Sequence, residues 1–212
     1  MKILVTGSSG FVGSAFVKYA REKGHKVFEF DLPTKNILKN VEPSIQKSDI
    51  VVHMAAIADL YETAKDIDKN FDVNIKGTWN VAKACERYDK PLINISTCCV
   101  YGDANTRTDN EDKTIPATIE PYACSKMAGE YLLRGFEHLF YANLRIGTVY
   151  GPGMRPALFN YVALEKVMKG QVIKINGNGK QTRTYIYIDD LVKGIYQACI
   201  RFDKIALQTI NI

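Results

Sequence analysis

The sequence predicts an α/β fold built on a doubly wound parallel sheet, and two observations support this prediction. Apolar runs typical of strands alternate with amphipathic runs typical of helices along the whole chain. This alternation predicts parallel strands joined by right-handed helical crossovers. The first apolar run, Ile3 to Val5, leads directly into a glycine-rich turn from Gly7 to Gly13, and a strand, a tight turn and a helix in this order begin such a sheet.

The remaining elements follow from hydrophobic periodicity. The apolar run at 49–56 is continuous, which predicts a strand covered by helices on both faces. The segment at 71–88 places apolar residues from Ile75 to Cys85 on one stripe of a helix. Strands or extended segments are expected at 3–5, 26–31, 49–56, 91–97, 142–150, 171–175 and 207–212, and helices at 11–20, 71–88, 122–140, 157–169 and 189–201.

Composition excludes several classes of protein. With 212 residues, 46% of them hydrophobic, the chain can bury one sizeable core. The net charge is +5, but the lysines are dispersed, so we expect no nucleic-acid partner. The longest apolar stretch, 50–58, is too short to span a membrane, and no signal pattern precedes the glycine turn; a cytoplasmic protein is expected. The five cysteines show no metal-ligand spacing, which predicts no metal site and small buried thiols.

The glycine turn has the spacing Gly-x-x-Gly-x-x-Gly. Such a turn directs backbone N–H groups and the positive end of a helix dipole at one point, which suits a pyrophosphate. Asp31 ends the second strand-like run, 18 residues after Gly13. A carboxylate at this place accepts hydrogen bonds from the hydroxyls of the adenosine ribose and repels a 2'-phosphate. The sequence therefore favours NAD over NADP, although the nearby Lys35 leaves NADP open.

Tyr122 and Lys126 form a Tyr-x-x-x-Lys pair at the start of a predicted helix, after Pro121. A spacing of four places both side chains on one helical face. An ammonium near a phenol favours the phenolate and is expected to lower a pKa that is ordinarily about 10. The pair therefore predicts a tyrosine that exchanges protons near neutral pH.

Together, these features resemble the extended short-chain dehydrogenase/reductase superfamily, specifically the NAD-dependent sugar-nucleotide epimerase/dehydratase family and its UDP-glucose 4-epimerase-like members. The matching stretches are TGSSGFVG (6–13), FEFD (28–31), DIVVHMAA (49–56), NIKGTWNV (74–81), ISTCCVYG (95–102), EPYACSKMAGE (120–130), LRIGTVYGP (144–152) and QTRTYIYIDD (181–190). They occur in the family's order over essentially the whole chain.

The resemblance implies a role for each matching residue. For the cofactor, NAD, it implies contacts from Gly7, Gly10, Phe11, Val12, Gly13, Asp31, Asn36, Ile37, Met54, Ala55, Ala56, Ala58, Asn74, Ser96, Tyr122 and Lys126. It implies Thr97, Tyr122 and Lys126 as catalytic residues, and Thr97, Thr148 and Arg183 as residues that bind a nucleotide-diphosphate sugar.

The residues after Thr97 bear on the reaction. Family members that eliminate water have a sequence resembling Thr-Asp-Glu from the position of Thr97 onward. This chain instead has Cys98 and Cys99 after Thr97, which matches the 4-epimerases. An ordinary thiol pKa of about 8.5 and the expected burial argue against a cysteine base. The sequence thus favours inversion at C4 through a 4-keto sugar. A 4-reductase, a dehydratase and a non-catalytic NAD-binding module remain alternatives.

The resemblance also implies a domain organisation. Residues 1–152 are expected to form the NAD-binding Rossmann domain, and 153–212 a partial, C-terminally truncated substrate lobe interleaved with the last Rossmann elements. Family members usually continue beyond this point, which is why the module remains an alternative. A homodimer is expected through a four-helix bundle of the helices at 71–88 and 122–140, whose outward faces carry apolar residues such as Met127, Tyr131 and Leu132.

Overall fold

The computed structural model describes residues 1–102, 111, 120–175, 177–180 and 182–212; Gln181, in the last matching stretch, lies outside them. The strands are β1 (Lys2–Thr6), β2 (Lys26–Phe30), β3 (Ile50–His53), β4 (Leu92–Thr97), β5 (Tyr141–Ile146), β6 (Thr148–Tyr150), β7 (Tyr185–Tyr187) and β8 (Thr209–Asn211). The helices are α1 (Phe11–Glu22), α2 (Glu42–Gln46), α3 (Leu60–Lys65), α4 (Ile67–Phe71), α5 (Gly77–Arg87), α6 (Pro121–Leu133), α7 (Phe159–Met168) and α8 (Ile188–Ile200). A π-helical turn, η1 (Asp72–Lys76), and two 3-10 turns, η2 (Cys98–Tyr101) and η3 (Phe202–Lys204), complete them.

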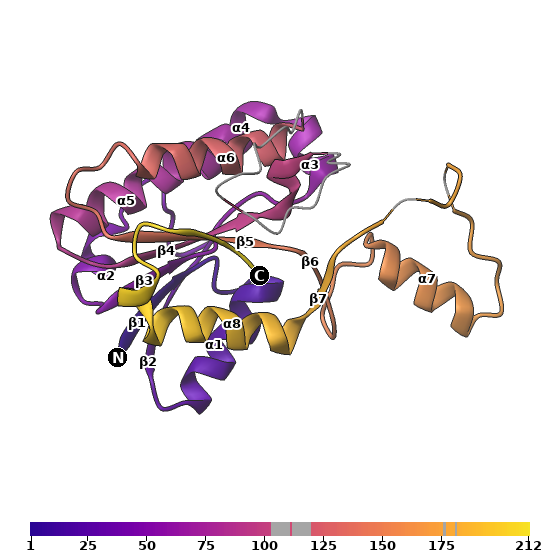
Figure 1. Cartoon of the computed structure of the whole chain (residues 1–212), viewed down its shortest axis with the longest axis horizontal. Coiled ribbons are helices and arrows are strands. Elements are labelled where there is room, and N and C mark those ends of the chain that lie inside the picture. Colours follow the sequence, from indigo (N-terminus) through magenta and orange to yellow (C-terminus); the bar gives the residue numbers. More distant parts are fainter. Residues whose placement is uncertain (103–110, 112–119, 176, 181) are drawn as a thin grey trace.

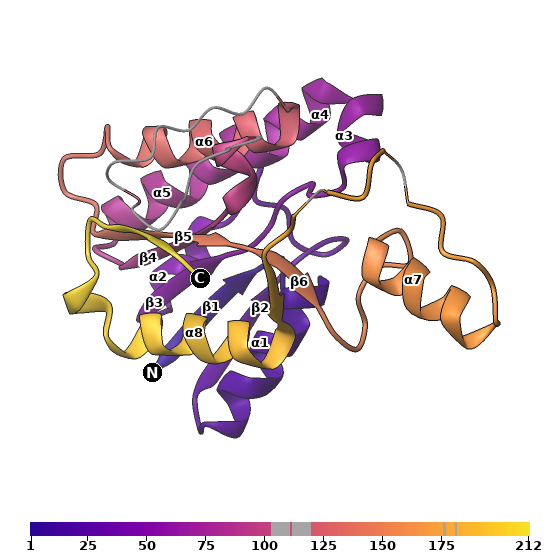
Figure 2. The ribbon, with the colours of Figure 1, turned by 45° about the vertical axis from the view of Figure 1, so that its right-hand side comes forward.

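Six parallel strands form the main sheet in the order β2-β1-β3-β4-β5-β8. The predicted doubly wound sheet is therefore confirmed. Helices α1 and α8 cover one face, and α2, α5 and α6 cover the other (Figures 1 and 2). The central strands are apolar on both faces because each face is covered: Ile3, Leu4 and Val5 are fully buried. Burying each such side chain contributes roughly 1.5–3 kcal/mol.

The strand order places a ligand crevice at one edge of the sheet. The chain reverses direction across the sheet between β1 and β3, which are neighbours. In open α/β sheets, ligands bind outside the carboxyl ends of the strands at such a switch point. Thr6 and His53, paired in register, mark that edge, and the glycine turn follows directly after Thr6.

The strand predicted at 142–150 is two strands in two sheets. β5 joins the main sheet, whereas β6 pairs with β7 in a separate two-stranded sheet. Gly147 lies between them, and its amide donates to the carbonyl oxygen of Ile212 at 3.1 Å. Apolar and polar residues alternate through both halves, so the periodicity of the sequence does not reveal this division.

Two helices also differ in extent from the segments that the sequence predicted. The segment predicted at 71–88 contains α4, η1 and α5 in succession, since hydrophobic periodicity does not detect a single π turn. The helix predicted at 122–140 ends at Leu133, and the following residues lead through Gly135 to β5. Leu139 is buried in the core there, which explains its apolar character without a helix.

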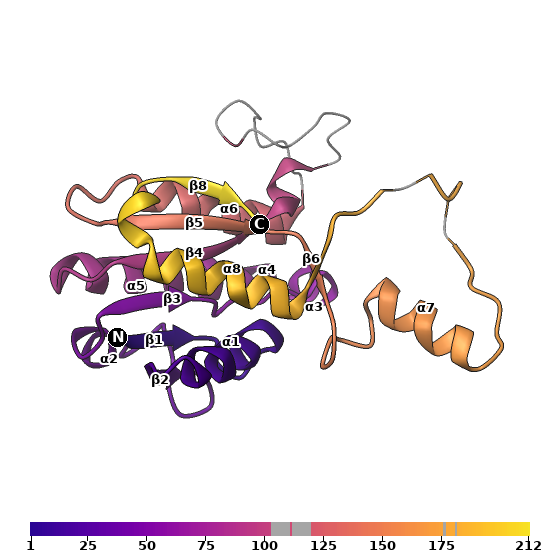
Figure 3. The same ribbon diagram turned by 60° about the horizontal axis from the view of Figure 1, so that its bottom comes forward.

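The segment that follows β6 stands apart from the main body. Helix α7 buries none of its residues, and in Figures 1 and 3 it projects beyond the small β6–β7 sheet. No strand forms at 171–175. The chain then returns to the main sheet, where α8 packs beside α1 and β8 pairs with β5.

Candidate active site

The glycine turn packs tightly against its own backbone and against the loop after β3. Gly7 has φ +69°, a conformation that favours glycine, and a Cβ there would lie 2.7 Å from the backbone nitrogen of Ala55. A Cβ at Gly13 would lie 2.0 Å from the carbonyl oxygen of Gly7. No side chain caps α1 at Gly10, and the first amides of a helix have no intrahelical acceptor. The amides of residues 11–13 therefore form a cradle for an anion.

Asp31 lies beside this turn. Its Oδ2 accepts hydrogen bonds from the Ser9 backbone amide at 2.9 Å and from the Ser9 hydroxyl at 2.6 Å. The carboxylate is thus oriented by the glycine turn itself. No sequence motif assigned a role to Ser9, and the available signal was its place between Gly7 and Gly10.

A buried hydroxyl joins the carboxyl ends of β1 and β3. Thr6 Oγ1 accepts hydrogen bonds from the backbone amides of Met54 and Ala55, both at 3.2 Å, and lies 2.7 Å from Nδ1 of His53. Burial lowers the pKa of His53 to about 3, so its imidazole is neutral. Met54 and Ala55, both predicted cofactor residues, are held at the edge of the switch point.

The same hydrogen-bond chain reaches the π turn. His53 Nε2 lies 3.0 Å from Thr78 Oγ1, which donates its own proton to the carbonyl oxygen of Asn74 at 2.6 Å. Nε2 is therefore the donor and Nδ1 the acceptor. Asn74 Oδ1 accepts from the Ile57 amide at 2.8 Å, and its Nδ2 donates to Ser125 Oγ at 2.9 Å. The side chain of Asn74 thus holds the loop after β3 against α6.

Other predicted cofactor residues lie at different depths. Ile37 is buried, and a Cβ at Gly77 would lie 2.4 Å from its Cδ1. Its side chain belongs to the core, so contact with the adenine remains a prediction for the backbone of this segment. Asn36 and Ala56 are half-buried, and Ala58 is exposed in the loop after β3.

Thr97 and Tyr122 are brought together from different elements. Thr97 is the last residue of β4 and is 6% exposed, whereas Tyr122 lies in the first turn of α6. The Thr97 side chain acts to lower the pKa of the Tyr122 phenol, which shows that the two side chains are close. Lys126 follows one helical turn later and is 4% exposed. The sequence alone could place only Tyr122 and Lys126 on a common face.

The electrostatics of this set differ from the sequence expectation. Burial raises the pKa of Tyr122, as does the neighbouring thiol of Cys99, while the Thr97 hydrogen bond and the charge of Arg155 act to lower it. The expectation of a lowered phenol pKa is therefore wrong for this chain, because desolvation outweighs the favourable contacts. Burial also lowers the pKa of Lys126 to about 8.

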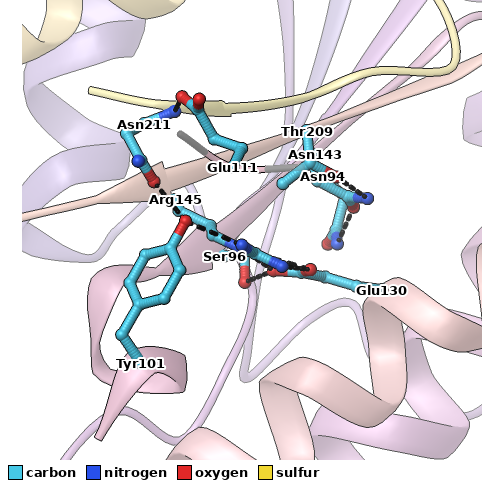
Figure 4. A network of polar contacts seen from close by, with 9 residues as sticks. All are labelled: Asn94, Ser96, Tyr101, Glu111, Glu130, Asn143, Arg145, Thr209 and Asn211. Carbon is cyan, nitrogen blue, oxygen red and sulfur yellow. Dashed lines mark hydrogen bonds and ion pairs between the residues drawn. The ribbon is translucent and has the colours of Figure 1, made fainter. Parts of the chain in front are cut away.

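A buried ion pair supports the catalytic helix. Arg145 donates to Glu130 from Nε at 3.0 Å and from Nη2 at 2.7 Å, and the two side chains are 5% and 3% exposed. Ser96 Oγ also donates to Glu130, and the Tyr101 hydroxyl accepts from Arg145 at 2.7 Å. In Figure 4 the guanidinium lies between Glu130 and Tyr101. The predicted cofactor residue Ser96 therefore uses its hydroxyl to tie β4 to α6.

The polar network extends across three strands (Figure 4). Tyr101 donates to Asn211 Oδ1 at 2.9 Å. Asn94 donates to Asn143 at 2.8 Å, and Asn143 donates to Thr209 at 3.3 Å. β4, β5 and β8 are thus joined by side chains as well as by backbone pairing, which fixes the edge of the sheet next to η2.

The predicted substrate residues lie at the same end of the sheet. Thr148 begins β6 and is paired in register with Tyr185. Arg183 is exposed just before β7, and its charge acts to lower the pKa of both Cys98 and Cys99. The structure therefore brings Arg183 within electrostatic reach of η2, the turn that follows Thr97.

Arg155, to which no sequence motif pointed, also lies at this end of the sheet. Arg155 forms an ion pair with Asp59 that links the segment after β6 to the loop after β3. Its charge also acts on Tyr122. The available signal was its position two residues after Gly153, in a stretch where the chain changes character.

The expectation of buried thiols is only partly met. All the cysteines are free; Cys85 and Cys199 are buried, Cys98 and Cys124 are half-buried, and Cys99 is exposed. Cys99 is accessible because it lies in a turn at the edge of the sheet rather than in a covered strand.

The phosphate cradle and the Thr97–Tyr122 pair lie at one edge of the same sheet, an arrangement that serves hydride transfer in short-chain dehydrogenases and reductases. Comparison with known proteins agrees with this class. A model of the NAD-dependent epimerase/dehydratase family matches residues 3–212, and the chain belongs to this family.

Several relatives are named in more detail. The chain is 29% identical to a putative UDP-glucose 4-epimerase of Methanocaldococcus jannaschii, over 90% of this chain and 71% of that protein. It is 28% identical to a dTDP-D-glucose 4,6-dehydratase of Dictyostelium discoideum, over 90% of this chain and 54% of that protein. The structure of UDP-glucuronic acid 4-epimerase from Bacillus cereus, in complex with UDP-glucuronic acid and NAD, is similar with a TM-score of 0.90 and 30% identity, covering 100% of this chain and 77% of that chain.

NAD is the cofactor, and the chain's own residues fit it. The glycine cradle has no room for a Cβ at Gly7 or Gly13, and Asp31 lies beside it. Lys35, which left NADP open, donates from Nζ to the carbonyl oxygen of Glu29 at 2.6 Å and lies over the ring of Phe30. This lysine is therefore engaged with β2.

Neither a metal centre nor a membrane span is found among the described residues. No group of three or more His, Cys, Asp or Glu side chains there could hold a metal ion. No helix in the described ranges is both long and apolar enough to cross a membrane.

Gly13→Ala is expected to weaken NAD binding by about 10- to 100-fold. The added methyl group would collide with the Gly7 carbonyl oxygen, and overpacking of this kind costs roughly 1–3 kcal/mol. Titration of NAD by isothermal calorimetry measures the effect. Gly135→Ala is the matched control, because a Cβ there would lie 3.4 Å from the nearest atom. Equal affinities for the two variants would contradict the role of Gly13.

Proposed function

We propose that this chain catalyses the NAD-dependent inversion of C4 of a nucleotide-diphosphate sugar through a transient 4-keto sugar. The observation that supports it most directly is the convergence of Thr97, the last residue of β4, and Tyr122, in the first turn of α6, where Thr97 acts to lower the pKa of the phenol. This pair lies at the carboxyl edge of the sheet that binds NAD, with Lys126 one helical turn away. A hydroxyl that holds the reacting oxygen and a phenol that moves its proton are what oxidation at C4 requires.

Each residue has a defined task in this mechanism. NAD, bound at the glycine turn, supplies the acceptor and later the donor of a hydride. Tyr122 accepts the proton of the sugar 4-hydroxyl, while Thr97 holds the same oxygen. Because burial raises the phenol pKa, the Lys126 ammonium is needed to favour the phenolate. The keto sugar then turns within the site, and Tyr122 returns the proton when C4 is reduced on its other face.

Arg183 and Thr148 bind the rest of the substrate in this proposal. Guanidinium groups suit a diphosphate because they donate two parallel hydrogen bonds. We place the NAD-binding domain at 1–152 and the substrate-binding part at 153–212, although α8 and β8 of the latter join the main fold. The similarity to UDP-sugar epimerases supports a UDP-sugar as the substrate.

A dehydratase is the second candidate, since a dTDP-D-glucose 4,6-dehydratase is among the relatives. Elimination of water needs an acid and a base beside the reacting carbons. The two residues after Thr97 are Cys98 and Cys99 rather than carboxylates, which favours the epimerase. A 4-reductase would use exchangeable NADP, and the engaged Lys35 favours NAD.

Product analysis tests these alternatives directly. The protein is incubated with NAD and, in separate reactions, UDP-glucose, UDP-glucuronate and dTDP-glucose, and the products are identified by NMR. A C4 epimer without net formation of NADH is expected. A 4-keto-6-deoxy sugar would identify a dehydratase, and stoichiometric consumption of a reduced cofactor would identify a reductase. Tight NAD binding without turnover of any sugar would identify a non-catalytic module.

The affinity for NAD is expected to fall as the pH rises through about 8. The proposal gives Lys126 a hydrogen bond to the nicotinamide ribose, and burial lowers the pKa of this lysine to about 8. Its ammonium is therefore present below this pH and is lost above it. NAD titrations between pH 6.5 and about 9.5 measure the change, and Lys126→Met should remove it. A constant wild-type affinity over this range would rule out the contact.

The proposal includes a homodimer formed by the outward faces of α5 and α6. Trp79 and Tyr131 are 43% and 53% exposed on these helices, and Phe136 packs against the Trp79 ring with centroids 4.8 Å apart. Pairing the two helices with those of a second copy would cover these side chains in a four-helix bundle. Analytical ultracentrifugation of the purified chain tests this assembly.

A further inference from the structure

The segment that follows β6 begins with a tight turn packed against the main body. The amide of Met154 donates to the carbonyl oxygen of Gly151 at 3.1 Å, and Gly153 has φ +89°. Pro152 followed by a left-handed glycine is typical of a type II turn. A Cβ at Gly151 would lie 2.5 Å from Cγ2 of Ile188, the buried first residue of α8. The base of this turn is therefore fixed against α8.

The tip of the turn reaches the glycine turn that follows β1. A Cβ at Gly153 would lie 3.6 Å from Cδ2 and 3.8 Å from Cε2 of Phe11. The space between the Gly153 backbone and the phenyl ring thus holds little more than a methyl group. Phe11 is the first residue of α1, and its amide belongs to the cradle for an anion. The turn after β6 therefore lies against one wall of the cofactor site.

An ion pair holds the end of the same segment to the loop after β3. Nη1 of Arg155 donates to Oδ2 of Asp59 at 2.5 Å. The two side chains are 45% and 33% exposed. Water reaches both groups, so the pair favours one position of the segment without locking it there.

These two contacts place residues 151–155, which we call the strap, across the crevice between β1 and β3. Phe11 belongs to the helix that follows β1, and Asp59 belongs to the loop that follows β3. The two strands are neighbours and define the switch point at which such sheets bind a ligand. A segment that contacts the chain on both sides of this point crosses the mouth of the cofactor site.

We propose that the strap is a gate that retains NAD, and that the ion pair between Arg155 and Asp59 keeps this gate closed. NAD enters or leaves past the strap only while the pair is broken. Retention suits a cofactor that is regenerated in every turnover, whereas a reductase must exchange its cofactor each time. The gate acts on NAD alone and requires no sugar, so its test is separate from that of the proposed function.

The rates of NAD binding and release test the gate. The protein is loaded with radiolabelled NAD and chased with excess unlabelled NAD, and rapid filtration follows the label that remains bound; binding is followed in the same way. In Arg155→Gln both rates should rise by about two- to fivefold, the range that an exposed ion pair supplies. The dissociation constant should change by less than about twofold, because a gate alters the barrier for entry and exit alike.

Further variants show whether the pair itself is the cause. Arg155→Lys keeps the positive charge and should release NAD at nearly the wild-type rate. Asp59→Asn should reproduce Arg155→Gln, and the double variant should release NAD no faster than either single variant, since the same contact is already broken. Arg87→Gln is the matched control: it breaks an ion pair with Glu42 whose side chains are 63% and 41% exposed, between α5 and α2, and should leave both rates unchanged.

Salt provides a second readout of the same contact. Raising the ionic strength from about 0.02 M to about 0.5 M screens an exposed ion pair. Release from the wild type should therefore accelerate more than release from Arg155→Gln. An equal salt dependence of the two proteins would contradict the gate.

Three kinetic results would overturn the proposal. The first is wild-type release rates in both Arg155→Gln and Asp59→Asn. The second is faster release with an unchanged binding rate and a weaker dissociation constant, which would mean that Arg155 contacts NAD directly. The third is additive acceleration in the double variant, which would mean that the two side chains act separately.

Discussion

Tyr122→Phe is expected to lower turnover by about 10²- to 10⁴-fold, the range typical of a lost general acid–base group. The substitution removes the hydroxyl whose pKa Thr97 acts to lower and keeps the ring in the first turn of α6. The other hydroxyls of α6 are used elsewhere or exposed: Ser125 donates to the carbonyl oxygen of Tyr122 and accepts from Asn74, and Tyr131 is 53% exposed. Initial rates with the sugar that the product analysis identifies measure the effect.

Tyr131→Phe is the matched control for this loss. Tyr131 lies on the same helix but is 53% exposed on its outward face, so its hydroxyl has no part in the reaction. Affinity for NAD, measured by calorimetry, should stay within about threefold of the wild type in Tyr122→Phe. Turnover reduced less than about tenfold would remove Tyr122 from the catalytic role.

Glu130→Ala is expected to lower the free energy of unfolding by about 3–5 kcal/mol. The substitution leaves the Arg145 guanidinium buried, with the corresponding side chain 5% exposed, and removes the acceptor of the Ser96 hydroxyl. Desolvating an unpaired charge is more costly than losing the attraction between the partners. Urea denaturation followed by circular dichroism measures the change.

Two comparisons identify the cause of this destabilisation. The double variant Glu130→Leu with Arg145→Met removes both charges and should recover most of the lost stability. Glu62→Ala breaks an exposed ion pair with Lys65 whose side chains are 61% and 54% exposed, and should change stability by less than about 1 kcal/mol. If Glu130→Ala and Glu62→Ala had equal effects, burial of the first pair would not matter energetically.

Loss of Glu130 should also change the pKa of Lys126. Its charge acts to raise the pKa of Lys126, against the effect of burial. Without that carboxylate, the ammonium of Lys126 should be lost at a lower pH. The ion pair therefore links the stability of α6 to the charge of Lys126, the proposed catalytic lysine.

Local sequence was sufficient for the parts of the fold with strong, short-range signals. The turn from Gly7 to Gly13 was predictable because only glycine permits its close backbone contacts. Asp31 was predictable because it ends a strand of alternating character. Tyr122 and Lys126 were predictable because helical spacing places them on one face. Each of these inferences depends on residues close together in the chain.

Errors arose where distant segments compete for the same residues. The segment 142–150, predicted as one strand, is divided at Gly147 because β6 pairs with β7, which lies about 37 residues further along. The contact of Asn74 with the cofactor stays a prediction, but the structure also gives its side-chain amide two partners, Ile57 and Ser125. Neither partner can be inferred from the periodicity around Asn74.

The sequence by itself predicted the parallel sheet, the phosphate turn and the Tyr122–Lys126 pair, and the resemblance to the family added Thr97 to this set. The first three predictions follow from periodicity, glycine geometry and motif spacing. Only the tertiary structure decided which of these groups are charged. Burial raises the pKa of Tyr122 and lowers that of Lys126, while a neighbouring thiol and Arg183 lower that of Cys99. A pKa depends on solvent exclusion and on charges contributed by other segments, and both exist only once the chain has folded.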